Sequence, residues 1–172
     1  MIKLESGAFQ LQKSQGANGY VIPLGGSYVV VDPGMAMGAK AVIAELDTAG
    51  ILGDVSQVLL THGDTDHAGA AQMVAAAAGG QLWIGRADAD ILAGRAVPGT
   101  LVRKLLSMIM PPKLPDTVLY LGESPGFPQG MTAVPTPGHT PGHFALAWGN
   151  ALFCGDAARV RGDGSLKQFS GR

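Results

Sequence analysis

The chain has 172 residues, of which 47% are hydrophobic and 15% are charged, and its formal net charge is −1. This length suits a hydrophobic core of ordinary size, so we expect a single domain over residues 1–172. The apolar content excludes intrinsic disorder, and the lack of a basic patch argues against nucleic acid as a partner. No window approaches the ~18 apolar residues that span a membrane. With no signal peptide visible and one cysteine, Cys154, we expect a cytoplasmic protein without disulfides.

The first third of the chain predicts strands followed by a helix. Residues 8–12 alternate between apolar and polar, while 20–24 and 27–32 are rich in β-branched and aromatic residues. Gly25-Gly26 separates the last two strands and is a hairpin signal. From residue 36 to residue 49 apolar residues recur at helical spacing, and the glycine that follows is a candidate C-terminal cap.

Residues 55–85 predict a strand, a loop, a helix and a second strand, which is the βαβ pattern of a parallel sheet. The apolar run 55–60 is typical of a buried strand, and the alanine-rich segment 68–80 ends in two glycines. Beyond this unit, 86–94 and 100–110 predict helices. The Leu/Met face of 100–110 favours a helix packed on the core over a lid above a site. Further strands are predicted over 117–121, 131–136, 143–148 and 151–155.

Two histidines and two aspartates fall within six positions directly after the predicted strand 55–60, in the segment THGDTDH. Ligands that can lose a proton, held on a loop at the carboxyl end of a buried strand, are typical of a metal site. Two further segments follow the same logic: TPGHTPGH holds His139 between two Pro-Gly turns, and LFCGDAA places Asp156 after an apolar strand. This many ligands would suit two metals and a bridging hydroxide.

In this order the motifs resemble those of the metallo-β-lactamase-fold hydrolases. That family carries His-x-His-x-Asp-His after a strand, a later His in a loop and a bridging Asp after another strand. Asn18 near the first hairpin, and Asp32 and Gly34 at the end of a strand, extend the resemblance over most of the chain. TPGHTPGH is similar to the glyoxalase II and lactonase branches. The resemblance implies an αββα sandwich of two mixed β-sheets flanked by helices.

The resemblance also implies a role for each matching residue. The first metal would be bound by His62, Asp64 and His139, the second by Asp66 and His67, and Asp156 would bridge the two. Asp66 would in addition have a catalytic role, orienting the hydroxide. The expected metal is zinc in a binuclear centre, with a metal-bound hydroxide that attacks an ester, thioester, lactone or amide of a small-molecule substrate.

Asp64 stands where the family usually has His. With three carboxylates, two divalent metals and one hydroxide the centre is neutral, so we expect a weaker Lewis acid and a preference for harder metals such as iron or manganese. The alternative is that Asp64 only accepts a hydrogen bond beside an empty first site. We favour a ligand, because positions 62, 64 and 66 of an extended loop point the same way.

The family usually has one more His for the second metal, and none follows His143 in this chain. The sequence ends soon after Asp156 in a polar stretch, so we expect a fragment that lacks the closing elements of its second half. An uncovered apolar sheet face would then favour a homodimer. Two other functions stay open. One is an iron-dependent oxidoreductase of the same fold, similar to persulfide dioxygenases, and the other is a non-catalytic metal-binding or scaffold protein.

Several polar residues near the motifs have simpler interpretations. His143 is expected to hydrogen-bond within its turn and not to bind metal. Asp32 either orients a ligand loop or caps its own turn, two readings of similar weight. Asp88 and Asp90 are expected to begin a helix and to take no part in a site. Cys154 is expected to pack in the core.

Overall fold

Seven short strands pair side by side into the larger of the two main sheets. The computed structural model describes residues 1–97, 112–163 and 165–168, so the helix predicted over 100–110 lies outside the described residues. The strands follow their order in the sequence, antiparallel from β1 to β4 and parallel from β4 to β7. Their bounds are β1 (Ile2–Lys3), β2 (Phe9–Gln10), β3 (Tyr20–Leu24), β4 (Ser27–Val31), β5 (Val55–Leu59), β6 (Gln81–Ile84) and β7 (Leu119–Tyr120).

The hairpin between β3 and β4 confirms the predicted turn. Gly25 and Gly26 have φ values of 54° and 97°, the positive angles that a two-residue hairpin turn requires. Successive residues of β4 then point to opposite faces of the sheet. Val30 packs with the helices, whereas Val29 and Val31 pack against the second sheet. The strand is therefore buried on both faces, as its uninterrupted apolar run indicates.

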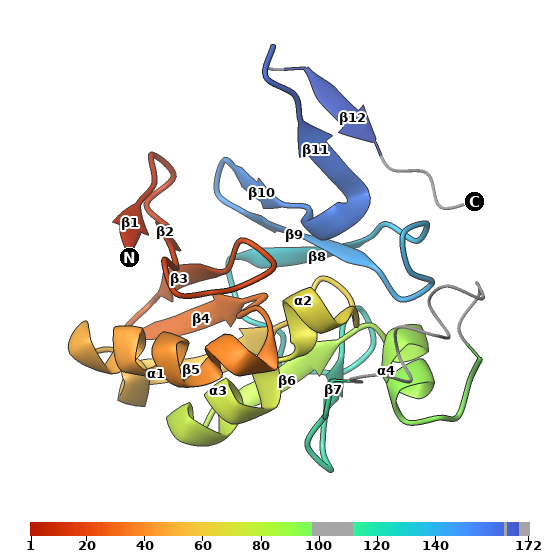
Figure 1. Cartoon of the computed structure of the whole chain (residues 1–172), viewed down its shortest axis with the longest axis horizontal. Coiled ribbons are helices and arrows are strands. Elements are labelled where there is room, and N and C mark those ends of the chain that lie inside the picture. The colour runs from red at the N-terminus through yellow and green to blue at the C-terminus, as the bar shows by residue number, and fades with distance from the viewer. Residues whose placement is uncertain (98–111, 164, 169–172) are drawn as a thin grey trace.

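Two helices cover one face of the larger sheet (Figure 1). Val42 and Leu46 of α1 and Val74 of α3 are fully buried and pack with Val30 and Val58 of the sheet. The helical elements are η1 (Ala36–Gly38), α1 (Ala39–Thr48), η2 (Leu52–Asp54), α2 (Thr65–Ala68), α3 (Ala71–Ala78) and α4 (Arg86–Leu92). None of the described helices is long and apolar enough to cross a membrane.

The helix ends and the βαβ unit agree with the sequence. Gly50 follows α1 with φ of 71°, and Gly79 closes α3 in the left-handed conformation with φ of 70°. Glycine adopts this conformation without steric cost, which is why it terminates helices. The chain from β5 through α3 to β6 returns to a parallel neighbour, so the predicted βαβ unit is confirmed.

A second, antiparallel sheet lies on the other face of the larger one (Figure 1). Met131, Leu146 and Phe153 of this sheet pack against Leu59 and Trp83 of the larger one. Its strands are β8 (Met131–Pro135), β9 (Phe144–Trp148) and β10 (Ala151–Phe153), in the order β10-β9-β8. A 3₁₀ turn, η3 (Gly155–Ala157), then leads into a two-stranded hairpin of β11 (Ala158–Val160) and β12 (Leu166–Gln168), which the sequence did not predict.

The expected two-sheet α/β fold is confirmed. Helices cover the larger sheet, but within 1–97, 112–163 and 165–168 no helix covers the outer face of the second sheet. On that face Leu152 is 61% exposed and Val134 is 41% exposed. The described residues thus form helix, sheet and sheet layers, and the fourth layer of an αββα sandwich is not among them.

Packing between the sheets predicts a clear contrast between two leucines. Leu59 is fully buried at the interface of the sheets, whereas Leu152 is exposed on the outer face. Leu59→Ala is expected to lower the free energy of unfolding by about 2–5 kcal/mol, since it leaves a cavity. Leu152→Ala should change it by less than about 0.5 kcal/mol. Urea denaturation of both variants measures this, and a similar loss in both would mean that the outer face is covered.

Candidate metal centre

The first motif begins where β5 ends, and it is not extended throughout. Asp64 has extended backbone angles (φ −71°, ψ 148°), and α2 begins at the next residue. The Asp64 carbonyl accepts hydrogen bonds from the N–H groups of His67 (3.0 Å) and Ala68 (2.8 Å), which starts the helical turn. The expectation of an extended loop through residue 66 was therefore wrong, because this turn carries both Asp66 and His67.

The two later segments reach the same edge of the fold. His139 lies in the loop between β8 and β9, and Asp156 lies in η3 directly after β10. His139 Nε2 is 3.0 Å from Asp64 Oδ2 and 3.3 Å from Asp156 Oδ2, and His62 Nε2 is 3.6 Å from Asp64 Oδ2. The structure thus brings together His62, Asp64, His139 and Asp156, which are as many as 94 positions apart in the chain.

The donor atoms around this point fit one metal ion. One donor atom each from His62, His139 and Asp156 lies within 4.8 Å of the others. Two imidazole nitrogens and a carboxylate oxygen form a donor set that zinc accepts. The Asp64 carboxylate adjoins both rings, so it lies within reach of the same ion.

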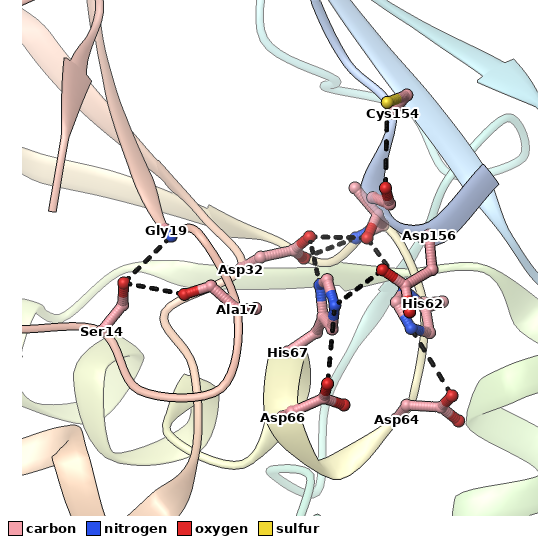
Figure 2. A network of polar contacts seen from close by, with 12 residues as sticks. Ser14, Ala17, Gly19, Asp32, His62, Asp64, Asp66, His67, Cys154 and Asp156 are labelled. Atoms are coloured by element: carbon pink, nitrogen blue, oxygen red, sulfur yellow. Dashed lines mark hydrogen bonds and ion pairs between the residues drawn. The ribbon is translucent and has the colours of Figure 1, made fainter. Parts of the chain in front are cut away.

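A second group of donors adjoins the first across Asp156. His67 Nε2 is 3.5 Å from Asp156 Oδ1 and 4.0 Å from Asp66 Oδ2. Asp156 thus turns one oxygen toward His67 and the other toward His139. Figure 2 shows Asp156 beside His62 and His67, and Asp66 against a different side of His67. All six sequence-predicted residues therefore lie in one cluster.

Asp32 connects the cluster to the strand before it. Its buried carboxylate accepts hydrogen bonds from the Thr61 N–H (2.8 Å) and the Thr61 hydroxyl (2.6 Å), and it pairs with His67 Nδ1 at 2.8 Å. Asp32 also has φ of 47°, the single non-glycine residue with positive φ among the described residues. Of the two interpretations left open by the sequence, the structure supports orientation of the ligand segment.

The same network determines which nitrogen of each ring faces the centre. Thr61 donates its hydroxyl proton to Asp32, so its oxygen accepts from His62 Nδ1 at 3.0 Å. His67 Nδ1 likewise donates to Asp32. In both rings the Nε2 atom is then the one whose lone pair can meet a metal. Thr61 therefore orients His62, a role that the sequence motif did not reveal.

Charge in the cluster is strongly coupled. Burial lowers the pKa of His67, but hydrogen bonds to Asp156 and Asp32 outweigh this effect and raise it to about 10. The hydrogen bond from His67 holds the pKa of Asp156 below its usual range. In the metal-free protein a proton on His67 thus balances part of the carboxylate charge, and a bound metal would replace that proton.

His143 lies beside the cluster without joining it. The side chain is almost fully buried, and its Nδ1 lies 2.8 Å from the Thr136 hydroxyl. Its ring stacks on His62 with centroids 5.0 Å apart. Burial lowers the pKa of His143 to about 4. His143 is thus neutral at pH 7 and supports the ring of His62 by packing, and its contact with Thr136 agrees with the expectation that it hydrogen-bonds locally.

The expectation that Asp88 begins a helix is confirmed, but it missed the contacts of the side chain. Asp88 does lie in the first turn of α4, but only 3% of it is exposed. Its carboxylate accepts hydrogen bonds from Gly63, Thr140 and Gly142, which belong to the first and second motifs. No spacing in the sequence predicts these contacts, because the partners are as many as 54 positions away.

The Asp32 contacts predict weaker metal binding in Asp32→Asn. Asparagine tolerates positive φ, so the change removes the charge that fixes His67 Nδ1 and Thr61 without straining the backbone. The affinity for Zn²⁺ should fall about 10–100-fold, as measured by competition with a chromophoric chelator. Asp47→Asn, on the exposed side of α1, is the matched control and should bind as the wild type does. Unchanged affinity in Asp32→Asn would contradict the orienting role.

The raised pKa of His67 predicts that the metal-free protein loses stability in alkaline solution. A histidine whose pKa rises from 6.5 to about 10 on folding contributes stability that is complete below pH 6.5 and lost as the pH approaches 10. Urea unfolding of metal-free wild type and His67→Gln at both pH values tests this. The wild type should lose more stability than the variant between the two, and parallel losses would refute the assignment.

Comparisons with known proteins place this geometry in a family. The sequence model of the metallo-β-lactamase superfamily matches residues 15–170, while no curated protein matches the chain. Similar solved structures include a HARLDQ-motif mutant of a metallo-β-lactamase from Cronobacter sakazakii, 17% identical over 93% of this chain and 59% of its own, with a TM-score of 0.65. The Rm3 metallo-β-lactamase is 25% identical over 84% of this chain and 56% of its own, with a TM-score of 0.65.

A third similar structure is BJP-1, a subclass B3 metallo-β-lactamase of Bradyrhizobium japonicum. It is 23% identical over 89% of this chain and 66% of its own, with a TM-score of 0.62. The chain spans 59% of the length of the Cronobacter structure. Since the family match covers most of the chain and the two-sheet fold agrees with it, the chain belongs to the metallo-β-lactamase superfamily.

Proposed function

We propose that this protein is a metal-dependent hydrolase with a binuclear centre beyond the ends of β5 and β10. The observation that carries the proposal is the position of Asp156, whose two oxygens face two different groups of donors. His62, Asp64 and His139 would hold the first ion, Asp66 and His67 the second, and Asp156 would bridge. Membership of a superfamily of metal-dependent hydrolases supports this assignment.

The donors fit zinc, since imidazole nitrogen and carboxylate oxygen are ligands that zinc accepts. A bound metal pair would supply Lewis-acid polarisation of a carbonyl group and activation of water. The protein's own part is orientation: Asp32 and Thr61 fix the rings of His67 and His62. The Asp66 side chain is 39% exposed and adjoins His67, so it can meet both substrate and solvent. We assign to Asp66 the orientation of the attacking water.

The proposed substrates are small molecules with an ester, thioester, lactone or amide bond. The segment TPGHTPGH resembles the glyoxalase II and lactonase branches, so we predict that the protein belongs to one of these branches of the superfamily. A centre with three carboxylates, Asp64, Asp66 and Asp156, is close to neutral when two divalent ions and one hydroxide are counted. Such a centre attracts an anionic substrate less than one with His at position 64, so we expect a preference for neutral substrates.

Asp64 also supports a second candidate function. Its carboxylate lies 3.0 Å from His139 Nε2, so a hard oxygen donor occupies the first site together with two histidines. Two histidines and a carboxylate are the ligands of many non-haem iron oxygenases. An iron-dependent oxidoreductase that acts on a persulfide is therefore the alternative to the hydrolase.

Metal content and activity together decide between these functions. The wild type is expected to hold about two equivalents of metal when purified, since a two-metal centre is proposed. His62→Ala and Asp64→Ala should each lose most of the first equivalent. Elemental analysis measures this, with Asp90→Asn on the surface of α4 as the control. Zinc together with hydrolysis of ester, thioester or lactone substrates supports the proposal.

Other results would lead to different conclusions. Iron at full occupancy, with oxygen uptake in the presence of a thiol persulfide, would favour the oxidoreductase. A chain that binds no metal even after incubation with Zn²⁺ would reject both enzymes. Asp64→His introduces the residue that the family usually has at this position. A higher affinity for zinc in this variant than in the wild type would show that position 64 contributes a ligand.

A further inference from the structure

A buried carboxylate outside the metal-ligand motifs joins two of them. Asp88 Oδ2 accepts hydrogen bonds from the Gly63 N–H at 2.9 Å and from the Thr140 hydroxyl at 2.7 Å. Asp88 Oδ1 accepts a third from the Gly142 N–H at 2.8 Å. These three donors belong to two loops that are almost 80 positions apart in the chain. Asp88 therefore connects two loops that are distant in the sequence.

The donors stand next to the proposed ligands of the first ion. Gly63 lies between His62 and Asp64, and Thr140 directly follows His139. A shift of either backbone segment would move the neighbouring ligand by a similar amount. Because metal binding requires donor positions accurate to fractions of an ångström, the Asp88 carboxylate is placed to control the spacing between the two halves of the first site.

Close packing of glycines supports this interpretation. A Cβ atom on Gly142 would lie 2.5 Å from the Asp88 nitrogen and 2.7 Å from its Cγ. A Cβ on Gly85, just before α4, would collide with the Gly142 carbonyl oxygen. A Cβ on Gly63 would lie 3.2 Å from the Asp88 Cβ. The start of α4 is thus fitted directly against both ligand-bearing loops, at a distance that only glycine allows at Gly142 and Gly85.

The chemistry of the contact calls for a carboxylate. Burial raises the pKa of Asp88, and the hydrogen bonds from Thr140, Gly142 and Gly63 oppose that rise. All three partners donate, so both oxygens must act as acceptors. Asparagine has the same shape, but its NH₂ group would face one of these donors and lose that bond. The change from Asp to Asn therefore tests the contact without creating a cavity.

We propose that Asp88 is a positioning residue of the first metal site, which holds the loop of His62 and Asp64 in register with the loop of His139. This inference rests on the proposed function, since it assumes that these three residues bind an ion. Among the described residues its carboxylate makes no hydrogen bond to Asp66 or His67, so the second site should be affected less.

Three readouts on the full chain test the proposal. Hydrogen exchange by NMR in the metal-free protein reports whether the Gly63 and Gly142 amides are protected. Zn²⁺ competition with a chelator, and the visible spectrum of the Co²⁺-loaded protein, report affinity and ligand geometry. The variants are Asp88→Asn, Thr140→Val and Thr140→Ser. Asp90→Asn is the matched control, because Asp90 lies on the same helix and pairs with the exposed Arg95.

In Asp88→Asn we expect at least one of the two amides to lose protection. The affinity for the Zn²⁺ equivalent assigned to the first site should fall about 10–100-fold. The Co²⁺ spectrum should change as well. Thr140→Val should weaken binding in the same way, and Thr140→Ser, which keeps the hydroxyl, should restore it. Asp90→Asn should match the wild type. Circular dichroism at the assay temperature ensures that only folded variants are compared.

Three outcomes would overturn the proposal. Unchanged exchange at both amides would show that the contact does not hold the loops. Lost protection with unaltered Zn²⁺ affinity and Co²⁺ spectrum would reduce Asp88 to a structural role. A wild-type chain that binds neither Zn²⁺ nor Co²⁺ would refute the proposed function and, with it, the positioning role. Hydrogen exchange in the metal-free protein would still show whether Asp88 holds the two loops together.

Discussion

The candidate metal centre depends on one buried charge, the carboxylate of Asp32. A buried carboxylate is costly unless charged or polar partners surround it. Asp32 finds its partners in Thr61 and His67, which are the residues that begin and end the first motif. Satisfying Asp32 therefore fixes the position of His67 directly and that of His62 through Thr61. The geometry of the donors follows from the need to compensate this charge, before any metal is bound.

The same need explains the electrostatics of the cluster. Asp32, Asp64, Asp66 and Asp156 all lie within 4.0 Å of a histidine nitrogen. Four carboxylates in one cluster repel one another. A proton or a metal ion bound among them is therefore stabilised, because its positive charge reduces this repulsion. In the metal-free state the proton on His67 is that cation, as its raised pKa indicates. Divalent ions compensate more charge than a proton, so the acidic character of the site favours metal over an empty, protonated state.

Much of the fold could be predicted because its signals are local. The Gly25-Gly26 turn, the glycines after α1 and α3 and the apolar run of β5 each depend on neighbouring residues, and all were confirmed. The convergence of the motifs was implied by the family resemblance, although they follow strands of two different sheets. The branch within the superfamily stays a prediction, since a shared motif does not specify a substrate.

The errors arose where distant contacts override local patterns. The segment after Asp64 alternates like an extended loop, but the N–H groups of His67 and Ala68 bind the Asp64 carbonyl and form a helical turn. Asp88 has the position of an ordinary residue at a helix start. Its burial depends on loops 25 and 54 positions away, which no periodicity reveals. The β11–β12 hairpin lay in a polar stretch without strand alternation.

Asp32 and Asp88 together hold the donor-bearing loops in place before any ion is bound. Asp32 acts on the first motif from the side of β4, and Asp88 acts on both ligand-bearing loops from the side of α4. Each is buried and accepts only from donors within the protein, so neither needs an ion to hold its loops in place. A site ordered in this way loses less conformational entropy when a metal binds. Such preorganisation matters at a metal site because affinity depends on how accurately each ligand is held.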